Sequence, residues 1–167
     1  GGKIIIKVPK ILKELAKKMI IIGNTCMYGA TGGKLFAEGI AGERFGVRNS
    51  GCTAIIEGSG DHTCEYMTGG SIIVLGKTGN NFGAGMTGGL SFVYDEDNTF
   101  AKKINTESVE IAKLSEAIFI EHQKYLLKSL KEYYKDTGSY IAKSIILNFK
   151  EEINKFVIIK PRASDFK

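Results

Sequence analysis

The sequence predicts an all-β core in which short strands stack as the coils of a β-solenoid. One tripeptide recurs along the chain, and the first residues of its copies are 19, 18 and 19 positions apart. A repeat of this length cannot bury a hydrophobic face alone, so we expect successive copies to stack on one another. The copies are Thr31-Gly32-Gly33, Ser50-Gly51-Cys52, Thr68-Gly69-Gly70 and Thr87-Gly88-Gly89.

Two further columns of residues support the repeat and predict its turns and strands. A glycine followed by a polar residue indicates a turn, because such a glycine has a positive φ or is closely approached by another backbone. These pairs are Gly23-Asn24, Gly42-Glu43, Gly60-Asp61 and Gly79-Asn80, and we expect a positive φ at Gly42, Gly60 and Gly79. β-Branched and aromatic residues predict strands at Leu35-Phe36-Ala37, Ala54-Ile55-Ile56, Ile72-Ile73-Val74 and Ser91-Phe92-Val93.

The N-terminal part of the chain follows the same pattern with an interruption. Residues 1–8 fit the columns of a fifth copy, with a strand from Lys3 to Val8. Residues 9–18 predict a short helix inserted between the first coil and the second, because apolar residues recur there at helical spacing. Ile20-Ile21-Ile22 then returns to a strand.

After Asp95 the glycine pattern stops, since 18 of the 21 glycines lie between Gly23 and Gly89. A last strand is expected at Val109-Glu110-Ile111. Two amphipathic helices should follow, the first capped by Ser115 and running to about residue 134.

The boundary between these helices is marked by turn chemistry. Gly138 suits the C-terminus of the first helix, and Ser139 suits the N-cap of the second, which runs to about residue 154. Residues 156–159 then form an extended segment stopped by Pro161. We therefore divide the chain into a β-helix over residues 1–111, with the helical insertion near 9–18, and a helical extension over 112–167 packed on the same domain.

One apolar column of the strands needs a cover. It lies between two columns that must face the solenoid core, so its side chains should point outward. A stripe of this size is rarely left in contact with water, and the C-terminal helices are the expected cover. Its members are Ile5, Phe36, Ile55, Ile73 and Phe92.

Composition and charge limit the class of protein. The chain has 167 residues, 43% of them hydrophobic, and a formal net charge of +5, which suits one globular domain. Residues 1–22 carry six lysines and one glutamate, and residues 23–98 carry four basic and eight acidic residues. Scattered lysines on helices are usually a solvated surface, so we expect no nucleic-acid partner. With no apolar run of membrane-spanning length and no signal peptide, we expect a cytoplasmic protein without a membrane partner.

The three cysteines, Cys26, Cys52 and Cys64, have no CxxC spacing and fall in three different columns of the repeat. Buried free thiols in a reducing compartment are the favoured interpretation over a metal or redox site. We therefore expect no metal site in this chain.

Two groups of residues are candidates for chemistry. Residues 83–88 spell GxGxxG, but a dinucleotide site needs a helix after this loop, and the sequence that follows is strand-like. The second group is a set of polar residues on two neighbouring coils. Asp61-His62 beside Ser50 or Cys64 would fit a nucleophile with its base, whereas a ladder of stacked turns with buried ion pairs is the simpler interpretation. The set is Glu43, Arg44, Arg48, Asn49, Asp61, His62, Glu65 and Tyr66.

Several long motifs resemble one known family, the C-terminal domain of the glutamate synthase large subunit. The resemblance extends over nearly the whole chain, through the repeats and the segments near residues 105–109, 137–139 and 156–162. The residues that carry it include Gly42-Glu43-Arg44-Phe45, Val47-Arg48-Asn49-Ser50-Gly51, Gly60-Asp61-His62, Cys64-Glu65-Tyr66-Met67-Thr68-Gly69-Gly70 and Asn81-Phe82-Gly83-Ala84-Gly85-Met86.

The resemblance implies a right-handed parallel β-helix without catalytic, cofactor-binding or metal-binding residues of its own. In the family, this domain positions an amidotransferase domain and a synthase domain that carries FMN and an iron–sulfur cluster, which together make glutamate from glutamine and 2-oxoglutarate. The residues that match the family motif are structural: Gly42, Glu43, Arg44, Arg48, Asn49, Gly60, Asp61, His62, Glu65, Gly69, Gly70, Gly83, Gly85 and Gly88.

Two other classes of function were weighed. A β-helix scaffold of a formylmethanofuran dehydrogenase has the same type of domain, but the Gly60-Asp61-His62 and Cys64–Met67 runs favour glutamate synthase. A hexapeptide-repeat acyltransferase has coils of about 18 residues, but it needs an apolar residue at every sixth position, and the glycine columns divide these coils unevenly.

The sequence leaves open whether the chain is an excised domain or a separate subunit. In either case, the strand at Lys3–Val8 would expose an unpaired edge, and bare edges recruit other strands. We therefore expect weak self-association through this end, with the helix over residues 9–18 covering part of it.

Overall fold

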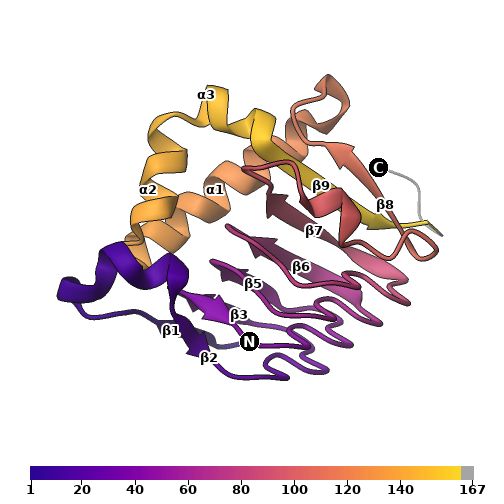
Figure 1. Ribbon diagram of the computed structural model, residues 1–167, viewed down its shortest axis with the longest axis horizontal. Helices are drawn as coiled ribbons and strands as arrows, with labels where there is room; N and C mark the ends of the chain where they lie inside the picture. Colours follow the sequence, from indigo (N-terminus) through magenta and orange to yellow (C-terminus); the bar gives the residue numbers. More distant parts are fainter. Residues whose placement is uncertain (163–167) are drawn as a thin grey trace.

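In the computed structural model, which describes residues 1–162, the chain forms a parallel β-solenoid with helices packed on one face (Figure 1). The main sheet has the strand order β1-β3-β5-β6-β7-β9-β8, and β2 pairs with β4 in a second small sheet. The strands of the stack are β1 (Lys3–Ile6), β3 (Lys34–Ala37), β5 (Thr53–Ile56), β6 (Thr68–Val74) and β7 (Gly88–Tyr94). The second sheet consists of β2 (Ile20–Ile22) and β4 (Ile40–Ala41).

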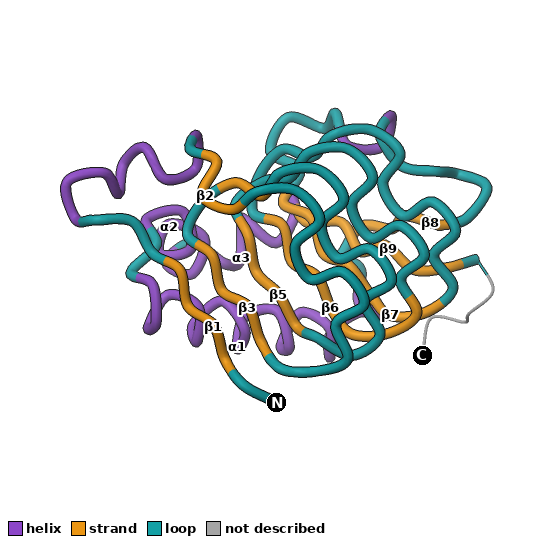
Figure 2. Tube along the Cα trace, turned by 90° about the horizontal axis from the view of Figure 1, so that it is seen from below, coloured by secondary structure: helices purple, strands orange, loops and turns teal. Residues whose placement is uncertain are grey.

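The register of the parallel strands is the one that the sequence columns predict. Ile5 lies opposite Phe36, Phe36 opposite Ile55, Ile55 opposite Ile73, and Ile73 opposite Phe92. Figure 2 shows the coils stacked one behind the next, with their loops in the same relative positions. The predicted β-solenoid is therefore confirmed.

Side chains alternate between two hydrophobic cores because successive strand residues point to opposite faces. The inner core lies inside the coils and includes Leu35, Ala54 and Ile72. The outer core includes Phe36, Ile55, Ile73 and Phe92, which pack against Leu126, Leu130 and Tyr133 of the first long helix. The predicted cover of the apolar stripe by the C-terminal helices is confirmed.

The C-terminal helices are α1 (Ile120–Thr137), α2 (Tyr140–Leu147) and α3 (Phe149–Glu152). Gly138 has φ 69° and donates its N–H to the Tyr134 carbonyl, which ends α1, and the Ser139 side chain accepts from Ala142 N as the N-cap of α2. Both predicted caps are confirmed. The short 3₁₀ helices of this half are η2 (Phe100–Lys102), η3 (Ala117–Phe119) and η4 (Ile153–Lys155).

Two helix boundaries differ from the sequence prediction. Ser115 is not the N-cap of the first helix, because the turn of η3 intervenes and Phe119 takes the cap position without a side-chain hydrogen bond. The second helix does not run unbroken to Asn154, since Asn148 has φ −120° and ψ 34°, and separates α2 from α3. The insertion near residues 9–18 is helical as predicted, but it is the 3₁₀ helix η1 (Lys10–Lys18).

The two ends of the solenoid are built differently. At one end, β9 (Phe156–Pro161) runs antiparallel between β7 and β8 (Val109–Lys113), and so closes the stack with strands from outside the repeat. At the other end, β1 pairs only with β3 among the described residues, and Ile4 and Ile5 are 57% and 41% exposed. The second edge is therefore open in residues 1–162.

Candidate functional site

The glycines that precede the polar turn residues are needed because the coils stack closely, and not because of their φ angles. None of Gly42, Gly60 and Gly79 has a positive φ, so that prediction is wrong. A Cβ atom on Gly60 would lie 3.0 Å from Glu43 N, and one on Gly79 would lie 2.4 Å from Asp61 N. The backbones of neighbouring coils approach too closely for any side chain. Close backbone approach, the alternative to a positive φ, therefore explains the glycines in this column.

The recurring tripeptides form a second close contact between the backbones of neighbouring coils. A Cβ atom on Gly51, Gly69 or Gly88 would lie 2.0–2.3 Å from the carbonyl oxygen of a residue on the coil before it. The second glycine of the tripeptide is left-handed at Gly33, Gly70 and Gly89, with φ of 79–81°. The first glycine therefore makes room for the neighbouring coil, and the second supplies the turn.

In the tripeptide Ser50-Gly51-Cys52, a cysteine stands where the other three copies have a left-handed glycine, and the Asn49 side chain holds its backbone. Its Oδ1 accepts from Cys52 N at 2.9 Å, and its Nδ2 donates to the Cys52 carbonyl at 3.0 Å. The Asn49 side chain is fully buried, so both of its polar atoms are satisfied inside the turn. Its predicted place in the structural motif has this physical basis.

Four stacked corners share an unusual backbone in which every second residue is left-handed. The φ angles at these positions are between 54° and 75°. We call residues 25–29, 44–48, 62–66 and 81–85 the left-handed corners. The left-handed residues are Thr25, Met27 and Gly29; Arg44, Gly46 and Arg48; His62, Cys64 and Tyr66; and Asn81, Gly83 and Gly85.

Hydrogen bonds in these corners run alternately toward the next coil and toward the previous one. The amides of Arg44 and Arg48 donate forward to the carbonyls of Asp61 and Glu65, at 2.8 and 2.9 Å. The amide of Gly46, between them, donates back to the Cys26 carbonyl at 3.0 Å. Each coil is thereby held to both neighbours, with Arg44 and His62 at equivalent left-handed positions.

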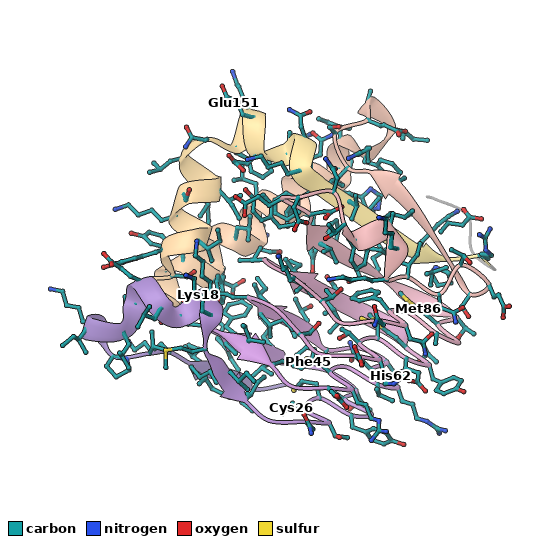
Figure 3. The ribbon with its side chains drawn as sticks, viewed as in Figure 1. Lys18, Cys26, Phe45, His62, Met86 and Glu151 are labelled. Carbon is teal, nitrogen blue, oxygen red and sulfur yellow. The ribbon has the colours of Figure 1, made fainter. Side chains whose placement is uncertain are left out.

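The alternating conformation is strained wherever the left-handed residue has a side chain. The left-handed region costs an L-residue about 1–2 kcal/mol, whereas glycine enters it freely. In the middle column, the side chains of Met27 and Cys64 turn into the inner core, and their burial offsets this cost. In the outer columns, Arg44, Arg48 and Tyr66 are exposed. Figure 3 shows this edge of the stack, with Phe45 and His62 on successive coils.

The arrangement around Asp61 and His62 does not provide a nucleophile with its base. Asp61 Oδ1 accepts from Asn80 N at 2.7 Å, and His62 Nδ1 lies 3.1 Å from Asn81 Nδ2. Ser50 Oγ donates to the Ala30 carbonyl at 3.3 Å on another coil. Cys64 faces the core, where burial raises the pKa of its thiol to about 12. These groups serve the turns, as the simpler interpretation predicts.

The ion pairs expected in this ladder are not buried. His62 Nδ1 is 3.3 Å from Glu65 Oε2, but both side chains are partly exposed, at 36% and 25%. Glu43, Arg44 and Arg48 are exposed. The prediction of buried ion pairs is therefore wrong, because the polar side chains of the corners point away from the coil interior.

The buried charges lie instead under the C-terminal helices, at residues that sequence reasoning missed. Glu57 is 2% exposed, and its Oε2 accepts hydrogen bonds from the hydroxyl groups of Tyr133 and Ser139. Glu38 is fully buried, and Lys13 Nζ lies 2.8 Å from both of its carboxylate oxygens. This network joins two coils, η1, α1 and the cap of α2.

Burial shifts the pKa of two groups in this network, Glu57 and Tyr133. Removal from water raises the pKa of Glu57, and the nearby Glu38 charge acts in the same direction, while the hydrogen bonds from Tyr133 and Ser139 oppose the shift. Burial and the Glu57 charge also raise the pKa of Tyr133 well above its usual value. A signal in the sequence could have found these two glutamates. Glu38 and Glu57 each come two positions after a member of the outward stripe, Phe36 and Ile55, and residues two apart in a strand point to the same face.

Comparison with known proteins places this arrangement in a family. The protein-family model described as GXGXG motif matches residues 1–162. The chain belongs to the GXGXG motif family. The description GXGXG names a glycine at every second position. This spacing agrees with the left-handed corners, in which every second residue is left-handed, as at Gly83 and Gly85.

The relatives of this GXGXG domain are glutamate synthases. The chain is 47% identical over 162 residues to the NADH glutamate synthase of Schizosaccharomyces pombe, an alignment covering 97% of this chain and 8% of that protein. It is 50% identical over 162 residues to a ferredoxin-dependent glutamate synthase of Antithamnion sp., covering 96% and 10%. It is 49% identical over 157 residues to ferredoxin-dependent glutamate synthase 2 of Synechocystis sp., covering 93% and 10%.

The chain thus spans about a tenth of the length of the relatives that it matches. It corresponds to the GXGXG-type domain of the glutamate synthase large subunit, as the sequence motifs indicated. Within residues 1–162, no helix is both long and apolar enough to cross a membrane. A relative from Arabidopsis thaliana is named chloroplastic/mitochondrial, so the cytoplasmic location stays a prediction.

The residues of the GXGXG domain do not fit the iron–sulfur cluster of the implied parent enzyme. An iron–sulfur cluster needs several cysteine thiolates at one point, and here Cys52 and Cys64 are buried free thiols while Cys26 is partly exposed. In the described part of the chain, no three His, Cys, Asp or Glu side chains converge on a common point. The GxGxxG run at residues 83–88 leads into β7 and not into a helix.

Proposed function

We propose that this chain is a non-catalytic scaffold domain of a glutamate synthase large subunit. In the parent enzyme, it would position the amidotransferase domain and the FMN and iron–sulfur synthase domain, which together convert glutamine and 2-oxoglutarate to glutamate. The single observation that carries the proposal is the match of almost the whole chain to about a tenth of several glutamate synthases.

The structure supports a positioning role through the way in which its polar residues are used. Asp61 and Asn49 accept hydrogen bonds from backbone amides of the turns, and Glu57 accepts hydrogen bonds from the helices that cover the sheet. A polar group whose hydrogen bonds are all used within the fold has a structural role and does not act as a general acid or base. FMN and the iron–sulfur cluster would be held by other parts of the parent enzyme.

The proposal separates this chain from the two other classes of function. The relatives reported above are glutamate synthases, and none of their names describes a formylmethanofuran dehydrogenase or an acyltransferase. The coils also repeat at 18 or 19 residues with left-handed corners, a pattern that differs from a hexapeptide repeat.

A domain exchange tests the proposal. Residues 1–162 replace the matching 162-residue segment of the Schizosaccharomyces pombe enzyme, and NADH-dependent glutamate formation from glutamine and 2-oxoglutarate is measured. We expect turnover within about tenfold of the parent, which corresponds to about 1.4 kcal/mol in the activation barrier. Deletion of the segment should abolish turnover.

A second measurement on the exchanged enzyme tests whether polar residues of this domain take part in catalysis. His62→Gln and Glu43→Gln alter the polar corner without changing a glycine contact, so kcat should stay within about twofold of the unsubstituted exchange. A loss of kcat by a hundredfold or more at unchanged KM in either variant would overturn the non-catalytic role. An exchanged enzyme that folds and binds flavin but makes no glutamate would overturn the proposed function.

A further inference from the structure

We propose that the solvent side of the left-handed corners, centred on Arg48 and Tyr66, is a docking site for a carboxylate-bearing segment of a neighbouring domain. The inference deepens the proposed scaffold role and rests on it for the origin of the partner. It is carried by three observations: a strained backbone under exposed side chains, a preformed hollow, and an arginine without a carboxylate.

The first observation is the choice of residue in one column of the corners. Gly29, Arg48, Tyr66 and Gly85 are equivalent positions on successive coils, with φ of 61°, 57°, 54° and 66°. Glycine adopts this conformation without strain and is used at both ends of the column. Arg48 is exposed and Tyr66 is 51% exposed, so burial in the fold does not offset their strain. Strained residues of this kind concentrate at functional sites.

The second observation is that these side chains are already arranged. The Tyr66 ring lies against Gly85, because a Cβ atom there would be 2.4 Å from its Cδ1 and Cε1 atoms. The Arg48 guanidinium carbon lies 5.8 Å from the centroid of the same ring. Together with Thr68, Gly85 and Thr87, the two side chains line an open hollow of about 450 Å³. An occupant would meet an aromatic surface, a guanidinium and two hydroxyl groups.

The third observation is that Arg48 has no ion-pair partner within residues 1–162. The Glu65 carboxylate, on the neighbouring coil, lies 3.3 Å from His62 Nδ1, and the Arg162 guanidinium lies 3.4 Å from Glu110. Of the ion pairs among the described residues, none includes Arg48. A guanidinium fork matches a carboxylate with two parallel hydrogen bonds.

These features select the chemistry of the occupant. An Asp or Glu side chain would pair with Arg48, its methylene groups would lie on the Tyr66 ring, and its flanking backbone would reach the hydroxyl groups of Thr68 and Thr87. Arginine and tyrosine are also the residue types that dominate binding energy at protein interfaces. The chain covers only 8–10% of the relatives reported above, so a parent of this size supplies further domains to carry such a segment.

The test uses the 167-residue chain and two capped peptides as probes. Acetyl-Gly-Glu-Gly-amide and acetyl-Gly-Gln-Gly-amide differ only in the carboxylate, and sodium acetate controls for a free anion. NMR titration follows the Arg48 Nε–H and the Gly85 amide. We expect saturable shifts with the Glu peptide, at least tenfold weaker binding of the Gln peptide and of acetate, and loss of the shifts in Arg48→Gln.

A stability measurement makes the test independent of binding strength. Arg48→Gly relieves the left-handed strain, so its unfolding midpoint should equal or exceed that of the wild type, while its Glu-peptide shifts disappear. A clear fall of the midpoint in this variant would show that Arg48 serves the fold itself, and would overturn the proposal. Equal shifts with the Glu peptide, the Gln peptide and acetate would overturn it as well.

The two proposals can fail separately. An inactive domain exchange together with Glu-dependent shifts at Arg48 overturns the glutamate synthase scaffold and supports the docking site. An active exchange without Glu-dependent shifts overturns the docking site and supports the scaffold.

Discussion

The left-handed corners and the helix-covered face of the sheet hold the same coils together by opposite means. In and beside the corners, the contacts are between backbones: a Cβ atom on Gly60 or Gly79, just before a corner, would clash with the preceding coil, and the side chains of Arg44 and Arg48 are exposed. On the covered face, Phe36, Ile55, Ile73 and Phe92 pack against α1, and the carboxyl groups of Glu38 and Glu57 are buried.

This difference shows where each region tolerates change. A corner depends on the absence of a side chain at fixed positions, so substitution adds a clash that neighbouring backbone cannot relieve. The covered face depends on the side chains that are present, so substitution removes packing or hydrogen bonds and leaves the backbone in place. The glycines just before the corners should therefore be the least replaceable residues, and the exposed corner side chains among the most replaceable.

The largest expected effect is at a glycine just before a left-handed corner. Gly60→Val places a branched side chain where even a Cβ atom would be 2.9 Å from Glu43 Cγ and 3.0 Å from its amide nitrogen. Overpacking of this kind costs about 1–3 kcal/mol, and the upper end of this range corresponds to a fall of about 6–12 °C in Tm for a chain of this size. Thermal unfolding followed by circular dichroism measures it, with the exposed Lys124→Ala as the control that should leave Tm unchanged. Equal and negligible effects of both substitutions would contradict the stacked coils.

The next effect tests the covered face through pH. Burial raises the pKa of Glu57 above its ordinary value in the folded chain, so the fold favours the protonated acid. The stability from this group is therefore fully present below the unfolded pKa and is lost as the pH rises through the folded pKa. Glu57→Gln keeps a neutral side chain of similar size, and so the pH-dependent loss should disappear.

Urea unfolding at several pH values from 4.5 to 7 measures this loss. The wild type should lose stability relative to Glu57→Gln as the pH rises over that range. Glu121→Gln, on the exposed face of α1, is the matched control and should follow the wild type. A wild type and a Glu57→Gln variant with parallel pH profiles would show that Glu57 titrates normally.

Sequence reasoning found the parts of the molecule that depend on periodicity. The register of Ile55 with Ile73, and the cover over that stripe, follow from alternation along a strand and from the need to bury apolar surface. The caps at Gly138 and Ser139 follow from local chemistry. Each of these inferences requires only residues that are near one another in the sequence or in the repeat.

The parts that were missed depend on contacts that the repeat does not encode. A positive φ was expected at Gly60, but close coil contact explains this glycine, and the left-handed residues are Arg44, His62 and others that have side chains. The partner of Glu57 is Tyr133, on a helix far along the chain, and no local pattern joins them. Ser115 was expected to cap a helix, but η3 moved the helix start to Ile120.

A smaller effect is expected where the helix cover runs out. Phe36 is 1% exposed under α1, but Ile5, the next member of the same stripe, is 41% exposed on β1, which pairs with β3 on one edge only among the described residues. Bare apolar edges recruit further strands, so the chain should self-associate weakly, and Ile5→Lys should abolish this.

Light scattering over a concentration series measures the mean mass against the 18.2 kDa monomer. Ile118→Lys, at a side chain that is 69% exposed on η3, is the control and should associate like the wild type. A wild type that stays monomeric at high concentration, like its Ile5→Lys variant, would exclude association through this edge.

The smallest expected effect reverses the usual sign and separates the two regions most sharply. Thr25 is an exposed, β-branched residue at φ 61°, a conformation that such residues rarely adopt. Thr25→Gly should stabilise the chain by up to about 1 kcal/mol, because the relief of the left-handed strain exceeds the entropy that glycine loses on folding. Thr53→Gly, in strand β5, should instead destabilise the chain by about 0.5–1 kcal/mol, since glycine weakens a strand interior. Urea unfolding of both variants measures the difference in sign. Destabilisation of similar size at both positions would mean that the corner threonine is not strained, and the contrast between the corners and the sheet would then rest on the glycine contacts alone.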